Sequence, residues 1–178
     1  MLEMAEMIAF FSRRDENYVN GMLKWLDIGN TEAAAGMIQE LTGAKLFRID
    51  PAQAYSKDYN QCIAQAQADQ RRDARPELKE YPEGMEGCDV IYLGYPNYWG
   101  TMPMAVFTFL EHMDFSGKTI RPFCTHEGSG LGSSLRDIRR LCPGAAVETG
   151  LAIRGGSVDQ SKEAIRCWLG NGGCGNEE

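Results

Sequence analysis

Residues 89–103 read DVIYLGYPNYWGTMP, and this stretch decides the fold class. Its first half is an unbroken apolar run, which is typical of a β-strand that is covered on both faces. Its second half is a loop of glycine, proline and aromatic residues, after which Pro103 favours the start of a helix. A buried strand that passes through such a loop into a helix indicates an α/β protein with a parallel sheet.

The segments on either side repeat this alternation of strand and helix. We expect β-strands at residues 7–11, 45–49, 89–94, 118–125 and 146–153. We expect helices at residues 31–41, 55–75, 134–141 and 159–169, and one more that begins at Pro103. Asn30 or Thr31 is the expected N-cap of the first helix. The pattern predicts a doubly wound parallel sheet of five strands with right-handed crossovers.

Composition and charge narrow the class of protein. The chain has 178 residues, 43% of them hydrophobic and 24% charged, which predicts one globular domain at residues 1–169 and a disordered tail at 170–178. The net charge of −7 argues against nucleic acid as a partner, because a phosphate backbone requires a basic face. No apolar run is long enough to cross a membrane.

Targeting and cysteine usage point to the cytoplasm. The first residues carry Glu3 and Glu6 and lack a basic segment, so we expect no signal peptide. The six cysteines form no CxxC motif and no zinc-binding spacing, so we expect reduced thiols and no metal.

Three loops are the candidate ligand-binding segments. In doubly wound sheets, ligands bind beyond the carboxyl ends of the strands. The loops that follow the first, third and fourth expected strands are residues 12–31, 94–102 and 125–132.

The first loop ends in Gly29-Asn30-Thr31, immediately before a helix. Free backbone N–H groups and short polar side chains at a helix start form an anion site. Ser12, at the end of the first strand, and Arg13 are expected to face the same place. The alternative is that Gly29-Asn30-Thr31 only caps the helix.

The second loop offers flat aromatic faces to a planar ligand. Its candidate contacts are Pro96, Asn97, Tyr98, Trp99 and Gly100. The alternative is that the two aromatic side chains only close the edge of the core.

The third loop, residues 125–132, reads THEGSGLG, and its glycines allow the backbone to approach a ligand closely. Its candidate contacts are Thr125, His126, Glu127, Gly128, Ser129 and Gly130. The alternative is a flexible turn before the next helix.

These segments resemble the flavodoxins and the flavodoxin-like FMN proteins over nearly the whole chain. Residues 96–103, PNYWGTMP, resemble the family stretch PxWWGTxP, and residues 125–130, THEGSG, resemble TxGGSG. Ser12 and residues 29–31 resemble the family's phosphate loop, S/T-x-T-G-x-T, split by an insertion at residues 13–28.

The resemblance implies a three-layer sheet with strand order 2-1-3-4-5 and one non-covalent FMN that cycles between oxidised and reduced states. It implies that Ser12, Asn30 and Thr31 hold the phosphate. It also implies that residues 96–100 border the isoalloxazine ring, with residues 125–130 on its pyrimidine side. The insertion departs from the family pattern and is expected to cover the flavin or an adjoining substrate site.

The resemblance leaves the redox role open. The chain is either an electron carrier for a partner protein or an NAD(P)H-dependent reductase of quinones or similar acceptors, and the long first loop favours the enzyme. A homodimer through the aromatic loops is a further alternative.

Three other functions are alternatives to this one. A phosphoacceptor signalling domain would need clustered aspartates at the ends of the first and third strands, where Ser12 and Tyr95-Pro96 stand instead. A serine hydrolase would need G-x-S-x-G, and Gly128-Ser129-Gly130 has the wrong spacing. A cofactor-free interaction module stays open.

Overall fold

The centre of the fold is a parallel β-sheet. The computed structural model describes residues 5–170. The sheet contains β1 (Glu6–Phe10), β4 (Lys45–Arg48), β5 (Val90–Pro96), β6 (Thr119–His126), β7 (Ala146–Val147) and β8 (Leu151–Arg154). Their order is β4-β1-β5-β6-β7, with β8 also paired to β6, and every pairing in this sheet is parallel. The order follows the predicted 2-1-3-4-5 except at the fifth position, where two strands, β7 and β8, pair with β6 in place of one.

The fifth strand is interrupted, which the sequence did not predict. Residues 148–150 lie between β7 and β8. Glu148 forms an ion pair with Arg121 at 2.7 Å. The carbonyl of Thr149 accepts a hydrogen bond from the indole of Trp168 at 3.1 Å. These two contacts hold residues 148–150 where the chain leaves the sheet between β7 and β8.

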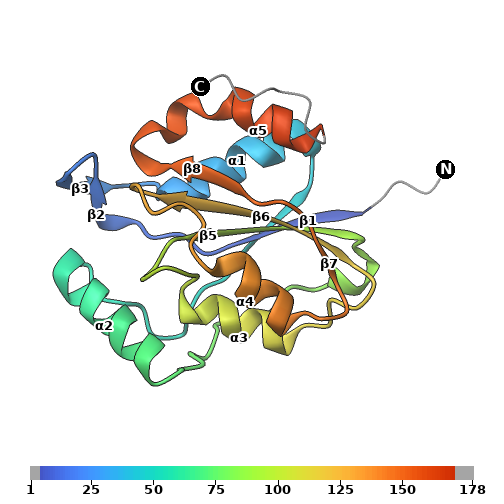
Figure 1. Ribbon diagram of the computed structural model, residues 1–178, viewed down its shortest axis with the longest axis horizontal. Coiled ribbons are helices and arrows are strands. Elements are labelled where there is room, and N and C mark those ends of the chain that lie inside the picture. The colour runs from blue at the N-terminus through green and yellow to red at the C-terminus, as the bar shows by residue number, and fades with distance from the viewer. Residues whose placement is uncertain (1–4, 171–178) are drawn as a thin grey trace.

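Helices cover both faces of the sheet (Figure 1). Helices α1 (Asn30–Thr42) and α5 (Lys162–Leu169) lie on one face, and α2 (Tyr59–Arg71), α3 (Met104–His112) and α4 (Ser134–Leu141) lie on the other. Two short 3₁₀ helices, η1 (Met85–Gly87) and η2 (Gly155–Gln160), complete the set. The predicted three-layer α/β class is confirmed.

Alternation along the strands divides the core between the two faces. In β1, Ile8 packs among buried residues of α1 and α5. Its neighbours Met7 and Ala9 pack into the cluster that includes Val106 and Leu110 of α3. Because successive side chains of a strand point to opposite faces, one apolar run serves both layers.

Two helix predictions were wrong in their bounds. The helix expected at 55–75 spans only Tyr59–Arg71, because the Asp58 side chain caps it by accepting from the Gln61 N–H at 2.9 Å. The helix expected from 159 begins at Lys162, since residues 159 and 160 belong to η2.

The insertion folds as an unpredicted antiparallel hairpin, β2 (Asp15–Val19) and β3 (Met22–Leu26). Asn20 and Gly21 form its turn, with φ of 52° and 81°. Two consecutive residues of positive φ are typical of a type I′ turn, and Asn-Gly is its preferred sequence. The hairpin lies beside α2 at one end of the sheet (Figure 1).

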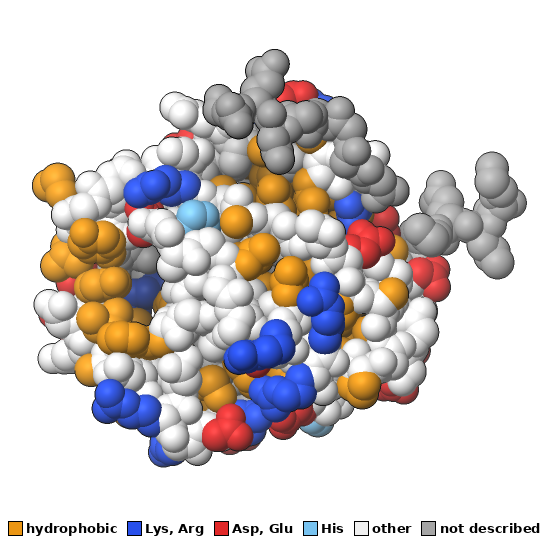
Figure 2. All heavy atoms as spheres, viewed as in Figure 1, with side chains coloured by type: hydrophobic (Ala, Val, Ile, Leu, Met, Phe, Trp, Pro, Cys, Tyr) orange, Lys and Arg blue, Asp and Glu red, His pale blue; other side chains and the backbone are white. Residues whose placement is uncertain are grey.

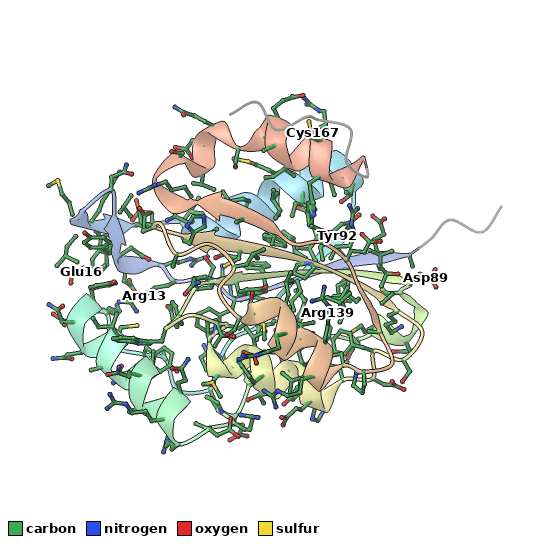
Figure 3. All side chains as sticks on the ribbon, viewed as in Figure 1. Arg13, Glu16, Asp89, Tyr92, Arg139 and Cys167 are labelled. Atoms are coloured by element: carbon green, nitrogen blue, oxygen red, sulfur yellow. The ribbon has the colours of Figure 1, made fainter. Side chains whose placement is uncertain are left out.

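The hairpin lies at the carboxyl ends of the strands of the parallel sheet. In Figure 3, Arg13 and Glu16 lie at this end, and Asp89, which immediately precedes β5, lies at the other. The ligand-binding end predicted from the topology is therefore the end that the hairpin covers.

The cysteines differ in part from the prediction. Cys62, Cys88, Cys124 and Cys142 are free and buried, whereas Cys167 is disulfide-bonded. Residues 171–178, most of the expected disordered tail, lie outside the described residues.

No helix within residues 5–170 is long and apolar enough to cross a membrane. The same residues contain no group of three or more His, Cys, Asp or Glu side chains that could hold a metal ion.

Candidate functional site

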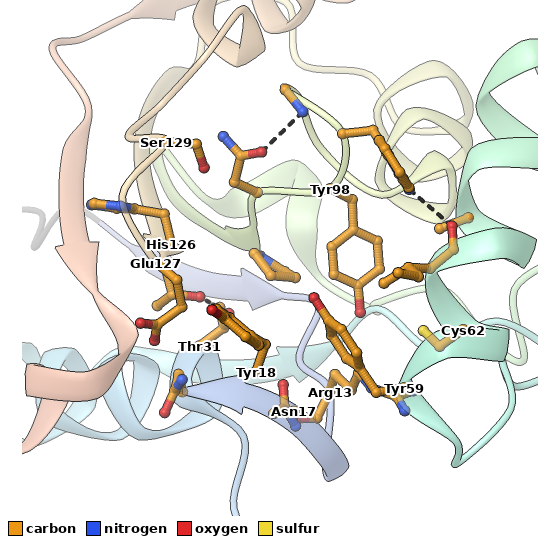
Figure 4. A pocket seen from close by; sticks show the side chains of 18 residues that line it. Arg13, Asn17, Tyr18, Thr31, Tyr59, Cys62, Tyr98, His126, Glu127 and Ser129 are labelled. Carbon is orange, nitrogen blue, oxygen red and sulfur yellow. Dashed lines mark hydrogen bonds between the residues drawn. The ribbon is translucent and has the colours of Figure 1, made fainter. Parts of the chain in front are cut away.

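A cavity of about 570 Å³ lies at the carboxyl end of the sheet. All three predicted loops reach it (Figure 4). Its volume is within the range of small-molecule sites. The predicted site residues that line it are Arg13, Asn30, Thr31, Pro96, Asn97, Tyr98, Trp99, Gly100, Thr125, His126, Glu127 and Ser129. The other four predicted residues, Ser12, Gly29, Gly128 and Gly130, do not line it.

The start of α1 forms one end of the cavity. Gly29 is the N-cap, not Asn30 or Thr31 as predicted, and it makes no side-chain cap. The cap is supplied by Ser12, whose hydroxyl accepts a hydrogen bond from the Glu32 N–H at 3.0 Å. The N–H groups of Asn30 and Thr31 make no hydrogen bond within residues 5–170. They are therefore available to an anion at this helix start.

Gly29 allows the close approach of the first loop to α1. A Cβ at this position would lie 2.2 Å from the Ser12 hydroxyl oxygen and 2.4 Å from the Arg13 carbonyl oxygen. Only a residue without a side chain fits here, which explains why this position of the loop is glycine.

Arg13 holds the insertion in place. Its guanidinium donates to the carbonyls of Glu16, Ser56 and Lys57, each at 2.9 Å. These bonds use three of the five N–H groups of the guanidinium and tie the first loop to the segment before α2. Arg13 also supplies positive charge to the cavity wall.

A buried hydroxyl pair joins the first loop to the third. Thr31 Oγ1 and Thr125 Oγ1 are 2.7 Å apart. Thr31 is 1% exposed and Thr125 is 4% exposed, so water does not compete for this bond. The contact fixes the start of α1 relative to the end of β6.

The loop after β5 forms a tight turn. Tyr98 and Thr101 are bridged, and the two residues between them, Trp99 and Gly100, have φ of 53° and 87°. Trp99 is a bulky residue in a conformation that such residues rarely adopt. The turn is held by Asn97, whose side chain accepts from the Gly100 N–H at 3.0 Å and donates to the Gly130 carbonyl at 2.8 Å.

Tyr98 and Trp99 hold different positions at the cavity. Trp99 is 47% exposed, and its indole N–H donates to the Ile63 carbonyl of α2 at 2.9 Å. The hydroxyl oxygen of Tyr98 is buried and makes no hydrogen bond within the described chain. Burial, followed by the proximity of Cys62, raises the pKa of Tyr98 well above its ordinary value.

His126 is fixed in one tautomer. Its Nδ1 accepts a hydrogen bond from the Gly128 N–H at 2.9 Å, so in the neutral ring the proton is on Nε2. Burial, followed by the charge of Arg154, lowers the pKa of His126 below its ordinary value. The neutral ring therefore presents a donor.

Glu127 lies near the start of α1. One carboxylate oxygen accepts from the Asn20 N–H of the hairpin turn at 3.1 Å. The other is buried and has no hydrogen-bond partner within residues 5–170. This oxygen and the side-chain nitrogen of Asn30 lie 2.7 and 2.4 Å from where a Cβ of Gly155 would stand.

Six residues of the cavity were not predicted from the sequence: Asn17, Tyr18, Tyr59, Cys62, Ile63 and Ala66. Two belong to β2 and four to α2. The rings of Tyr18 and Tyr59 stack with centroids 6.1 Å apart and join the hairpin to α2. The expectation that the insertion covers this site agrees with the position of β2. The Asn20-Gly21 turn signal could have revealed the hairpin.

Comparison with known proteins identifies the family. Residues 24–172 match the family model described as flavodoxin. The chain belongs to the flavodoxin family. No curated protein sequence matches it significantly.

Solved structures share the fold of this flavodoxin chain. A candidate flavoprotein from Bacteroides eggerthii is 27% identical, with a TM-score of 0.76 over 94% of this chain and 97% of that one. A second, from Bacteroides uniformis, is 25% identical, with a TM-score of 0.72 over 92% and 98% of the two chains. A flavoprotein from Lactobacillus acidophilus, solved in complex with FMN, is 18% identical, with a TM-score of 0.64 over 89% and 98%.

The residues that line this flavodoxin cavity fit FMN, the cofactor that the family implies. Free N–H groups at a helix start suit a phosphate, and aromatic and apolar side chains suit a planar ring. Two lining atoms, the Tyr98 hydroxyl oxygen and a Glu127 carboxylate oxygen, lack partners within the described chain. Glu127 opposes an anion, because its charge lies near Asn30.

Proposed function

We propose that this flavodoxin-family chain binds one FMN non-covalently in the cavity and uses it to carry electrons. The observation that carries the proposal is the convergence of three loops on one cavity, with free backbone N–H groups at one end and aromatic side chains in its walls. Family membership supports it, as does the FMN complex of the structurally similar Lactobacillus acidophilus flavoprotein.

The phosphate is assigned to the start of α1. The N–H groups of Asn30 and Thr31 would donate to it, and Arg13 would add positive charge. Ser12 would act indirectly, by holding the helix start through the Glu32 N–H.

The ring is assigned to the two remaining loops. Residues 96–100 would border it, and Thr125, His126 and Ser129 would lie along its polar edge. His126 would offer its Nε2–H as a donor there, since Nδ1 is held by Gly128. Tyr18 and Tyr59 would exclude water from the open side.

FMN supplies the redox chemistry when bound, because its ring accepts and releases electrons. The protein supplies position, a dry environment and fixed dipoles. The hairpin supports an NAD(P)H-dependent oxidoreductase over a simple carrier, because β2 adds Asn17 and Tyr18 to the cavity and gives it a wall that an acceptor could contact.

Titration of the apo-protein with FMN, riboflavin and FAD tests the proposal. FMN should bind more tightly than riboflavin, because riboflavin lacks the phosphate for which the helix start is suited. Equal affinities for FMN and riboflavin would show that the start of α1 does not bind the phosphate. Anaerobic addition of NADH or NADPH to the FMN-loaded protein then separates the roles, since loss of the yellow colour requires a reductase.

A further inference from the structure

The Trp99–Gly100 turn lies between two helices that carry exposed arginines. On one side, α2 contacts it through the Gln70 side chain, which donates to the Trp99 carbonyl at 3.2 Å. On the other side, the Ser133 N–H, next to the start of α4, donates to the Gly100 carbonyl at 2.8 Å. Any protein that approaches the cavity over Trp99 therefore meets both helices.

These helices present five arginines, which we call the arginine rim: Arg71, Arg72, Arg136, Arg139 and Arg140. All five are exposed, and the side chains of Arg72 and Arg136 are 72% and 76% exposed. Figure 2 shows basic side chains gathered over α4, and Figure 3 places Arg139 there. Arg71 and Arg139 form no ion pair within residues 5–170.

The carboxylates nearest to the rim are buried beneath it. Asp137 is 6% exposed and accepts from the Thr101 hydroxyl at 2.6 Å, while its other oxygen lies 3.6 Å from Arg136 and Arg140. Asp69 is 9% exposed and accepts from the Tyr55 hydroxyl at 2.6 Å and from Arg72 at 2.8 Å. The guanidinium groups consequently face solvent, and their counter-charges face inward.

Two exposed carboxylates, those of Asp73 and Glu111, pair with an arginine outside the rim. Asp73 and Glu111 both pair with Arg75, each at 2.8 Å. The rim thus keeps a local positive excess on a chain whose net charge is −7. Arg71 and Arg139, which form no ion pair within residues 5–170, carry part of this excess.

Trp99, at the turn between the two helices, is one of the exposed large hydrophobic side chains. The large hydrophobic side chains that are exposed in the described chain are those of Trp99 and of five hairpin-segment residues: Tyr18, Met22, Leu23, Trp25 and Ile28. Aromatic residues and arginine are enriched where proteins bind one another. A rim of one sign of charge steers a partner of the opposite sign.

From this charge complementarity we infer that the arginine rim is the docking surface for an acidic protein partner, which contacts Trp99 at the edge of the cavity. The inference rests on the proposed function, because it makes this partner the one that exchanges electrons with the bound FMN.

Binding of fluorescein-labelled poly-L-glutamate to the FMN-loaded protein tests the inference. The unmodified protein should bind it at low salt and lose it as salt is raised, despite its own negative charge. The variant R136Q/R139Q/R140Q should bind about tenfold more weakly. The control K45Q/K162Q/R166Q removes the same charge from β4 and α5 and should bind like the unmodified protein.

Each outcome decides the matter. No binding of poly-L-glutamate, or an equal loss in both triple variants, overturns the inference. Tighter binding of an oligothymidylate of matched length also overturns it, because the rim would then be a nucleic-acid site. If the R136Q/R139Q/R140Q variant misfolds, R139Q alone should still weaken binding. Flavin absorbance reports separately on the proposed function: binding without flavin uptake would keep the rim and refute electron exchange there.

Discussion

Gly29 provides the sharpest test of the anion site, through the variant Gly29→Ala. The new Cβ would lie 2.2 Å from the Ser12 hydroxyl oxygen and 2.4 Å from the Arg13 carbonyl oxygen, where contact normally requires about 3.5 Å. The second contact is with backbone, so the loop or α1 must move by about 1 Å. The φ of Gly29 is −66°, which alanine adopts freely, so the effect is steric alone.

Overpacking of this kind costs about 1–3 kcal/mol of unfolding free energy. With a urea m-value of about 2 kcal/mol/M, the unfolding midpoint should fall by roughly 0.5–1.5 M. The displaced segment carries the free N–H groups of Asn30 and Thr31. FMN affinity should therefore fall by about tenfold or more, because a misplaced donor loses its hydrogen bond.

Gly36→Ala is the matched control in the same helix. A Cβ at Gly36 would meet no atom within 4 Å. Alanine is favoured over glycine inside a helix, so this variant should gain about 0.5–1 kcal/mol and bind FMN normally. Urea unfolding and FMN titration measure both variants. If Gly29→Ala proves as stable as Gly36→Ala and binds FMN equally well, the close approach of loop and helix does not build the site.

Three further predictions concern the walls of the cavity. Thr31→Val strands the buried hydroxyl of Thr125, 2.7 Å away, and should cost about 1–3 kcal/mol in urea unfolding, whereas the double valine variant should cost less than the two single ones together. Burial lowers the pKa of His126 in the folded protein. The contribution of His126 to the free energy of unfolding is therefore complete above a pH of about 6.5, its pKa in the unfolded chain, and is lost as the pH falls through the pKa of the folded protein. FMN affinity should fall over the same range, because a protonated ring cannot accept the Gly128 N–H, and His126→Asn, which keeps an acceptor, should bind FMN with a flat pH profile. Glu127→Gln should raise FMN affinity several-fold and leave riboflavin affinity unchanged, since only FMN brings a phosphate to the start of α1; equal effects on both would place the carboxylate elsewhere.

The strands and the loops that follow them were predictable because a buried strand consists of apolar residues, which can be recognised in the sequence. The run at residues 90–94 is apolar throughout, and β5 is buried on both faces. Once the strands are assigned, topology places the loops at one end of the sheet. This reasoning found twelve residues that line the cavity.

The remaining residues depend on contacts between distant segments. Helix α2 is polar, and the sequence does not show that Cys62 and Ile63 face a cavity built by other elements. Ser12 was expected to hold the phosphate, yet its hydroxyl caps α1, a role that exists only once β1 and α1 are packed. The hairpin was missed for a different reason, because its Asn20-Gly21 turn signal is present in the sequence.

The amount of FMN released from the purified protein tests the central claim most directly. The protein should be yellow, and denaturation should release about one FMN per chain, identified by its absorbance and chromatographic mobility. A colourless protein that takes up no added FMN would contradict the claim, since the free donors at α1 and the aromatic walls would then lack the ligand assigned to them.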